Sequence, residues 1–244
     1  NAVFIASFSM NNRLLRDTHR WLGLIAGVQL LLWTVSGLYF TLIPIETIRG
    51  NHLLVDKPDP ALLVNTNLIS PSDLVRQHDG LRSITFEDIR LAQRLDRLVY
   101  VAEDAAFDAQ TGESLAPLSK EEAVHIVRAR TRLEPISAIK LEETAPDHEF
   151  RGGPLPVWQV QTTVENARFY VEPVSGRIRA VRTDAWRWFD FLWSLHIMDY
   201  ETRDNFNHLL IQFLSVLGLL TVLSGLALFV TTEIRKRTRI RSSN

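Results

Sequence analysis

Two long uncharged runs dominate this sequence. The first extends from Trp21 to Ile45 and holds 25 consecutive residues without a charged side chain, and the second extends from Leu209 to Thr232 and holds 24. At a rise of about 1.5 Å per residue, either run as a helix crosses the roughly 30 Å hydrocarbon core of a bilayer. The sequence therefore predicts two transmembrane helices, within 9–47 and 205–233, separated by a large insert.

The charges around these runs predict the orientation of the chain. Arg13, Arg16 and Arg20 precede the first run, and five Lys or Arg follow the second, in the basic tail 234–244. The insert from 48 to 185 carries 21 Asp and Glu against 17 Lys and Arg. Because basic residues flank spans on the cytoplasmic side, we expect both termini inside and the insert outside. The basic flanks indicate orientation and contact with membrane lipid, and we expect no nucleic-acid partner.

Several chemistries are excluded by residue content. The chain has no cysteine, so disulfides, thiol redox chemistry and thiolate or iron–sulfur sites are ruled out. It has no P-loop, dinucleotide fingerprint, nucleophile elbow or zinc-protease motif, so we expect no flavin or nicotinamide site. Any electron chemistry must use His, Met or a bound cofactor. The segment 2–8 is too short to span a membrane and no basic region precedes it, so we expect no cleaved signal peptide.

The insert, predicted as an extracytoplasmic domain over 48–184, contains two similar segments, at about 69–117 and 118–182. Each begins with a serine cap and an acidic first turn, which is typical of a short helix: Ile69-Ser-Pro-Ser-Asp-Leu-Val75 and Leu118-Ser-Lys-Glu-Glu-Ala-Val124. Each closes on strand-like residues and a turn, with 98–101 leading to 108–112 and 168–171 leading to 172–176. We predict two copies of a unit that joins a helix to an antiparallel sheet. A chance likeness of two Thr/Ser-Gly turns is the alternative.

Aromatic residues crowd the segment 185–204, after the insert. Such a segment is typical of an amphipathic helix lying in the outer membrane interface. It leads through His196 to His208 and the second span. The aromatic residues are Trp186, Trp188, Phe189, Phe191 and Trp193.

Each span pairs with a histidine by a similar spacing. His19 precedes Ser36-Gly37 by 17 residues, and His208 precedes Ser224-Gly225 by 16. Because the spans are antiparallel, each histidine should lie at the depth of the other span's Ser-Gly pair. Gly23 and Gly27 form a small-xxx-small pattern that lets another helix or a flat ring approach closely. Ordinary helix packing is the alternative.

Three parts of the sequence together resemble the PepSY-associated transmembrane family. They are Thr18-His-Arg-Trp-Leu-Gly23 with the later Ser36-Gly37, the insert closing on Val171-Glu-Pro-Val-Ser-Gly176, and Leu195-His-Ile-Met-Asp-Tyr200 before a last span with Ser224-Gly225. The resemblance covers 13–229 and implies a bacterial inner-membrane protein with a periplasmic PepSY-like domain. Better-understood members are haem proteins that pass electrons outward, including siderophore-iron reductases with four spans. This chain has two, so a second copy or another membrane subunit must supply the rest if the chemistry is kept.

The resemblance implies haem b as the cofactor, because neutral imidazole is a common axial ligand. The family motifs carry the ligand role to His19 and His196, and the depth relation adds His208. Gly37 and Gly225 are the predicted porphyrin-facing residues. His19 lies at the inner edge and the other two at the outer edge, so one haem cannot bridge them within one copy.

The remaining histidines and the methionine near the spans are weaker ligand candidates. His52 is expected in a solvated loop and Met198 in interfacial packing. The histidines of the insert have no metal-ligand spacing and receive no predicted site: His78, His125 and His148.

These observations predict a haem-binding inner-membrane electron-transfer subunit that passes electrons across the membrane to an extracytoplasmic acceptor. If the chain is part of an enzyme, it is a component of a membrane oxidoreductase. One alternative is an accessory or assembly subunit of a larger membrane complex, such as a respiratory one, without haem. Another is a regulatory module whose PepSY-like insert docks a peptide or partner. We expect a homo-oligomer or a complex with another membrane subunit.

Overall fold

The computed structural model describes residues 12–55, 67–143, 149–151 and 153–242. The expectations for 2–8 and His148 lie outside the described residues. The chain forms two compact units: a helical unit made of the chain up to Leu42 and from Phe189 onward, and an α+β unit over Ile43–Trp188. Each unit is described separately below.

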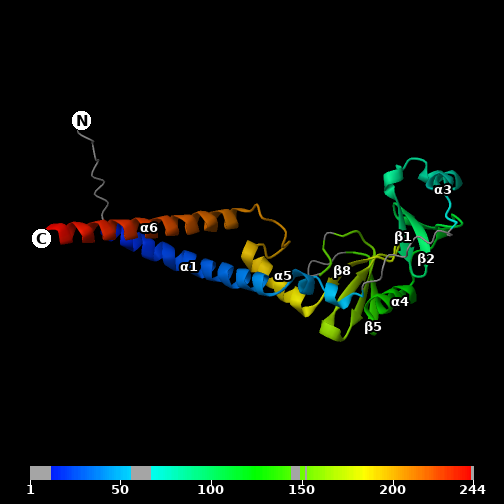
Figure 1. Cartoon of the computed structure of the whole chain (residues 1–244), viewed down its shortest axis with the longest axis horizontal. Helices are drawn as coiled ribbons and strands as arrows, with labels where there is room; N and C mark the ends of the chain where they lie inside the picture. The colour runs from blue at the N-terminus through cyan, green and yellow to red at the C-terminus, as the bar shows by residue number, and fades with distance from the viewer. Residues whose placement is uncertain (1–11, 56–66, 144–148, 152, 243–244) are drawn as a thin grey trace. The chain divides into compact units, whose positions relative to one another are not determined.

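Two long helices build the helical unit. Helix α1 covers Asn12–Leu42 and α6 covers Leu209–Ser242. The start of α1 lies beside the end of α6, so the two pack antiparallel (Figure 1). Their segments Leu15–Leu42 and Leu209–Ile234 are long and apolar enough to cross a membrane. Helix α1 ends two residues before Pro44, whose ring is incompatible with continuing the helix. The two predicted transmembrane helices are confirmed.

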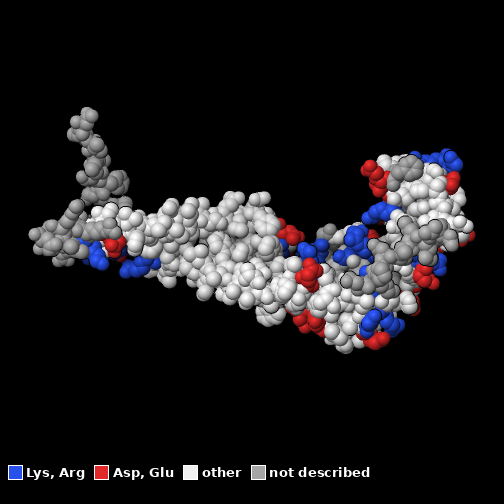
Figure 2. All heavy atoms as spheres, viewed as in Figure 1, with Lys and Arg blue, Asp and Glu red and all other residues white. Residues whose placement is uncertain are grey.

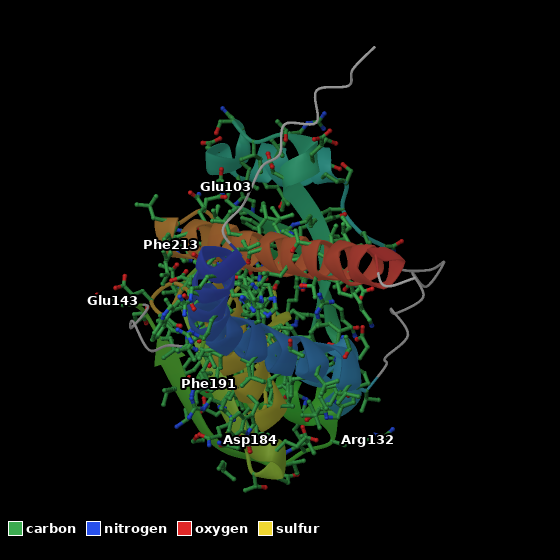
Figure 3. All side chains as sticks on the ribbon, turned by 90° about the vertical axis from the view of Figure 1, so that its left-hand side faces the viewer. Glu103, Arg132, Glu143, Asp184, Phe191 and Phe213 are labelled. Carbon is green, nitrogen blue, oxygen red and sulfur yellow. The ribbon has the colours of Figure 1, made fainter. Side chains whose placement is uncertain are left out.

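The outer surface of this unit is apolar. Figure 2 shows it as uncharged atoms over most of its visible face, with Lys and Arg at the end where α1 begins. Phe213, labelled on α6 in Figure 3, has 63% of its surface exposed, and Leu31 of α1 has the same fraction exposed. In water this surface would drive aggregation, whereas in a bilayer it contacts acyl chains.

The shielded faces of α1 and α6 repeat every seven residues. This period keeps one stripe of each helix turned inward and is typical of left-handed helix pairs. The shielded residues that follow this spacing, with others shielded beside them, are His19, Leu22, Ala26, Gln29, Trp33, Ser36 and Phe40 on α1, and Ile211, Leu214, Gly218, Thr221, Gly225 and Leu228 on α6.

A third helix, α5, covers Asp184–Ile197, and its part from Phe189 onward belongs to the helical unit. It packs on the second half of α1, where the ring of Phe40 contacts the rings of Phe189, Trp193 and His196. We predicted one amphipathic segment over 185–204. The helix stops at Ile197, and Met198 takes a left-handed conformation with φ of 57°. A connection to α6 follows at 198–208.

The α+β unit contains two four-stranded antiparallel sheets, each following a helix. Helix α3 (Pro71–Gln77) precedes β1 (Ile89–Arg94), β2 (Arg97–Ala102), β3 (Ala105–Asp108) and β4 (Ser114–Leu115), which pair in the order β1-β2-β3-β4. Helix α4 (Lys120–Thr131) precedes β5 (Pro135–Leu141), β6 (Val157–Thr162), β7 (Arg168–Val171) and β8 (Ile178–Arg182), which pair in the order β5-β6-β7-β8.

The two predicted copies of a helix plus an antiparallel sheet are therefore confirmed. Short helical turns complete the unit: α2 at Ile45–Ile48 and 3₁₀ turns at Asn51–Leu53, Asp79–Leu81, Phe86–Asp88 and Val164–Asn166.

The serine caps and glycine turns that identified the repeat are present. Ser70 and Ser119 accept hydrogen bonds from backbone amides three residues later, and Ser119 completes a capping box with Glu122. Gly112 and Gly176 both have positive φ, and a Cβ on Gly176 would lie 2.9 Å from Ile126 Cδ1. Glycine is therefore required at the turn.

The alignment of the repeat differs from the predicted one by one strand. We matched 98–101 with 168–171 as the strands before the two turns. In the structure 98–101 lies in β2, and β3, which ends at Asp108, lies between β2 and the turn. The counterpart of β7 is therefore β3.

Each repeat has its own core. In the second, α4 packs on the sheet through Ile126 and Val127, against Val160 and Phe169. In the first, Leu74 of α3 is fully buried with Tyr100 and Phe107. Burial of one such side chain stabilises the fold by about 1.5–3 kcal/mol. The domain thus consists of two small cores in tandem.

Candidate functional site

The first candidate site lies where the start of α1 meets the end of α6. His19 Nδ1 is 2.7 Å from the hydroxyl oxygen of Ser224. A Cβ placed on Gly225 would lie 3.0 Å from Cε1 of His19. The missing side chain of Gly225 is therefore what lets the imidazole lie against α6. This is the depth relation that the spacing predicts for His19.

The second candidate site lies where α5 packs on α1. His196 Nδ1 is 2.7 Å from the hydroxyl oxygen of Ser36, which is fully buried. The indole N–H of Trp33 donates to the carbonyl oxygen of His196 at 2.7 Å. The ring of Trp193 stacks with the His196 ring at an interplanar angle of 7°. The imidazole is thus held by Ser36 of α1 and Trp193 of α5, and the backbone of His196 is held by Trp33 of α1.

The two serines fix which ring nitrogen of each histidine carries the proton. The Ser36 hydroxyl donates to the carbonyl of Leu32 at 2.8 Å, and the Ser224 hydroxyl donates to that of Thr221 at 2.8 Å. A hydroxyl has one hydrogen, so with it committed to the backbone the oxygen accepts from the imidazole. In both neutral histidines Nδ1 then carries the hydrogen. The Nε2 lone pair has no partner among the described residues.

This arrangement is suited to binding a metal centre. Histidines that ligate metals usually donate their other ring N–H to a fixed acceptor, which orients the ring and selects the tautomer. Within the parts of the chain that the structure describes, no three His, Asp or Glu side chains gather to hold an ion. A haem does not need such a cluster, because the porphyrin supplies the equatorial ligands and the protein only an axial one.

The two sites lie at different levels of the unit. Their α1 residues, His19 and Ser36, are 17 positions apart, which corresponds to about 25 Å along a helix. One flat group therefore cannot contact both imidazoles. Each site offers a single histidine from this chain.

His208 contacts the end of α5 and the start of its own helix, and none of its hydrogen bonds in the described residues is to Ser36. Its Nε2 is 2.9 Å from the carbonyl oxygen of Ile197, and its Nδ1 accepts from the backbone N–H of Ile211 at 3.5 Å. Both ring nitrogens are therefore used at the start of α6. Ser36 pairs with His196 instead. Beside Gly37, a Cβ would meet nothing within 4 Å, so this predicted porphyrin-facing residue borders open space.

The weaker ligand candidates have other environments. His52 Nε2 contacts Glu165 at 3.0 Å on the surface, and His78 Nε2 contacts the carbonyl oxygen of Gly112 at 2.7 Å. Met198 is buried at the end of α5. His125 lies exposed on α4. In the described residues, none of these side chains forms a hydrogen bond or ring contact with either histidine–serine pair.

The sequence contained a signal for the His196 site that we did not use. Phe189, Trp193 and His196 are spaced by four and three residues, which places them on one face of α5. We assigned the aromatic residues to an interfacial belt. Their one-sided spacing instead indicated a helix packing face, with Trp33 and Phe40 as its partners on α1.

Comparison with known proteins identifies the family. The profile of the PepSY-associated TM region matches residues 16–244, which is nearly the whole chain. No curated protein and no solved structure matches the chain significantly. The profile covers both spans, both histidine–serine pairs and the α+β unit. The chain is therefore a membrane protein that belongs to the PepSY-associated transmembrane family.

Proposed function

We propose that this chain is a haem-binding electron-transfer subunit of a bacterial inner-membrane complex. The observation that supports the proposal is the repeated pair: two histidines at different levels, each bonded through Nδ1 to a helix serine and each with an Nε2 that has no partner in the described part of the chain. His19 and His196 would each supply one axial ligand. A bound haem b supplies a reversible one-electron carrier.

The donor set and the space around it fit such a group. Imidazole Nε2 is a usual haem ligand, and both imidazoles are oriented before anything binds. Gly225 removes side-chain bulk next to His19, and the flank of Gly37 is open. His208 has no free ring nitrogen in this arrangement, so the proposal rests on the other two histidines.

The proposal requires a partner. Each level offers one histidine, and two spans do not enclose a flat group on all sides. A second copy of the chain, or another membrane subunit, would complete each site from the lipid-facing side. Gly23 and Gly27 offer a close approach for such a helix, since a Cβ at either position would meet nothing within 4 Å.

An optical spectrum tests the proposal. The full chain is purified in a mild detergent, supplied with hemin, and recorded oxidised and after reduction with dithionite. We expect b-type bands that are lost in His19→Ala/His196→Ala and kept in His125→Ala, a control on the exposed face of α4. Absence of the bands in the unmodified protein, or their survival in the double variant, would contradict haem ligation by these histidines. The accessory-subunit alternative would then be preferred.

A further inference from the structure

A groove runs along one edge of the first sheet in the α+β unit. Two cavities of about 390 and 400 Å³ share Gln93, Arg130 and Gly176 and are therefore continuous. One wall is strand β1. The opposite wall comes from the last turns of α4 and from the turn between β7 and β8. We call this feature the β1 groove.

The groove follows the backbone edge of β1 and also reaches the face of the sheet at Val101 of β2. Four consecutive residues, 90–93, line it. Successive side chains of a strand point to opposite faces, so a cavity over one face would touch only every second residue. Strand β1 pairs with β2 on one side and is the terminal strand of its sheet. Among the described residues, nothing pairs with its other edge.

Positive charge lines both walls of the groove. Arg90, Arg130 and Arg177 border the groove and are exposed, and none of them forms an ion pair with a described residue. Glu172, the carboxylate that lines the same cavity as all three, is already held by Arg179 at 2.5 Å and by the Ser175 hydroxyl. Burial raises the pKa of Glu172, but these hydrogen bonds outweigh it and lower the pKa overall. Glu172 is thus ionised and held mainly by Arg179 and Ser175, with Arg90 acting on it through charge alone, so the three arginines can still pair with a ligand.

Apolar side chains alternate with these charges. Leu91 is 39% exposed at the groove, and Leu54 and Ile178 line the same cavity. An extended strand presents its side chains alternately to opposite sides, so one strand can offer carboxylates to arginines and apolar groups to these leucines and isoleucine. Asp96 and His125 border the far end of the groove.

We propose that the β1 groove binds an extended segment of a partner protein in which acidic and apolar residues alternate, added as a fifth strand beside β1. Main-chain hydrogen bonds to the free edge would supply the general affinity, as in other cases of strand addition. Carboxylates paired with Arg90, Arg130 and Arg177 would supply the selectivity. This site lies in the α+β unit and does not depend on haem.

A fluorescently labelled octapeptide of alternating Glu and Val tests the charge requirement. Its binding to the full chain in a neutral detergent is followed by fluorescence anisotropy. We expect Arg130→Glu/Arg177→Glu to weaken binding about tenfold or more (about 1.4 kcal/mol). Arg132→Glu serves as the matched control, because this exposed arginine, labelled in Figure 3, follows the end of α4 and is not among the residues that line the groove. A Lys-Val octapeptide should not bind.

Two further peptides test the strand requirement. One carries N-methyl groups on the odd residues and the other on the even residues, so that each removes one row of backbone N–H donors. Strand addition predicts that one of them loses binding and the other keeps it. Arg130→Gln/Arg177→Gln should also weaken binding of the Glu-Val peptide. Its far-UV circular dichroism should match that of the unmodified chain, which shows that the fold is kept. Absence of Glu-Val binding, equal binding by the arginine variants, or equal binding by both methylated peptides would overturn the proposal.

Discussion

Ser36 of α1 accepts the Nδ1 hydrogen of His196 at 2.7 Å, across 160 residues of sequence. The contact joins the first membrane helix to the helix that leaves the α+β unit, and it is repeated at the other level by Ser224 and His19. In both cases the serine gives its own hydrogen to its helix backbone. One hydrogen-bond arrangement therefore orients both imidazoles and leaves the same nitrogen available.

Removing the Ser36 hydroxyl should weaken the site without touching the ligand. In Ser36→Ala the His196 Nδ1–H loses its acceptor, and loss of such a supporting group typically costs about 10–100-fold in metal affinity. Titration with hemin in His19→Ala, which leaves only the His196 site, measures the effect. Thr34→Ala is the control, since the Thr34 hydroxyl donates to the carbonyl of Leu30 in its own helix and, within the described residues, makes no contact with His196. Equal hemin affinity in Ser36→Ala would show that the serine does not support the ligand.

The tautomer itself can be measured without haem. In apo protein with ¹⁵N-labelled histidine, we expect His19 and His196 to show a protonated Nδ1 and an unprotonated Nε2. The reason is that each serine oxygen has no hydrogen left to give to the ring. A protonated Nε2 in either neutral ring would contradict this assignment of the hydrogens, whatever the haem content.

The two histidines should serve separate sites. Because their levels are about 25 Å apart along α1, His19→Ala should remove one haem signal and keep the other, and His196→Ala should do the reverse. Haem per chain and the midpoint potential of the remaining signal are the measurements. Loss of all haem in either single variant, with an unchanged far-UV spectrum, would mean that the sites are not independent.

Bulk at Gly225 should displace His19. A Cβ there would already lie 3.0 Å from the imidazole, so Gly225→Leu must move the ring away from Ser224. We expect loss of haem from the His19 site. Gly218→Leu lies on the same helix, where a Cβ meets nothing within 4 Å, and should retain it. Full haem content in Gly225→Leu would show that haem binding at His19 does not require the imidazole to lie against Gly225.

Much of the helical unit could be predicted, because the two spans and the level of His19 follow from the length of an uncharged run and the rise per residue of a helix. The length of an uncharged run gives the spans, and the rise per residue gives the level at which His19 meets Ser224. The partner of Ser36 could not be obtained in this way. That partner depends on where α5 ends and on the path of the connection from Met198 to α6. The spacing between His208 and Ser224 gives information about neither.

The α+β unit shows the same division. Ser119 and Gly176 identified the caps and turns because their requirements are local: a hydroxyl for free amides, and a positive φ. The predicted correspondence between the strands of the two repeats was shifted by one strand. The reason is that β3 is only four residues long, so its alternation of apolar and polar residues is too short to detect. The β1 groove had no local signal, because its two walls come from separate repeats.

A reporter fusion tests the predicted membrane topology, in which both termini are cytoplasmic and the α+β unit is outside. We expect a reporter active only outside the cytoplasm to work when inserted in the exposed turn at Glu103–Asp104 (Figure 3), and to be silent when fused after Arg241. The reason is the basic excess beside both spans against the acidic insert. The reverse pattern would place the α+β unit in the cytoplasm.

The connection between α5 and α6 should depend on an ionised Asp199. Its carboxylate accepts hydrogen bonds from the Thr202 hydroxyl and from the backbone N–H groups of Glu201, Thr202, Asp204 and Asn205, the last at 3.0 Å. Burial raises the pKa of this carboxyl, but the hydrogen bonds outweigh it and hold the pKa well below its usual value of 3.8. The carboxylate is therefore the form that orders the connection.

The sign of the pH dependence follows from that lowered pKa. A group whose pKa is lower in the folded chain stabilises it above the ordinary pKa, and the contribution is lost as the pH falls through the lowered value. Amide hydrogen exchange at Thr202, Asp204 and Asn205 should therefore stay slow, after correction for the intrinsic rate, down to about pH 4. In Asp199→Ala these amides should exchange faster already at pH 7, because their acceptor is gone, while amides in the middle of α6 are unchanged. Slow exchange at all three amides in that variant would show that the backbone alone orders the connection.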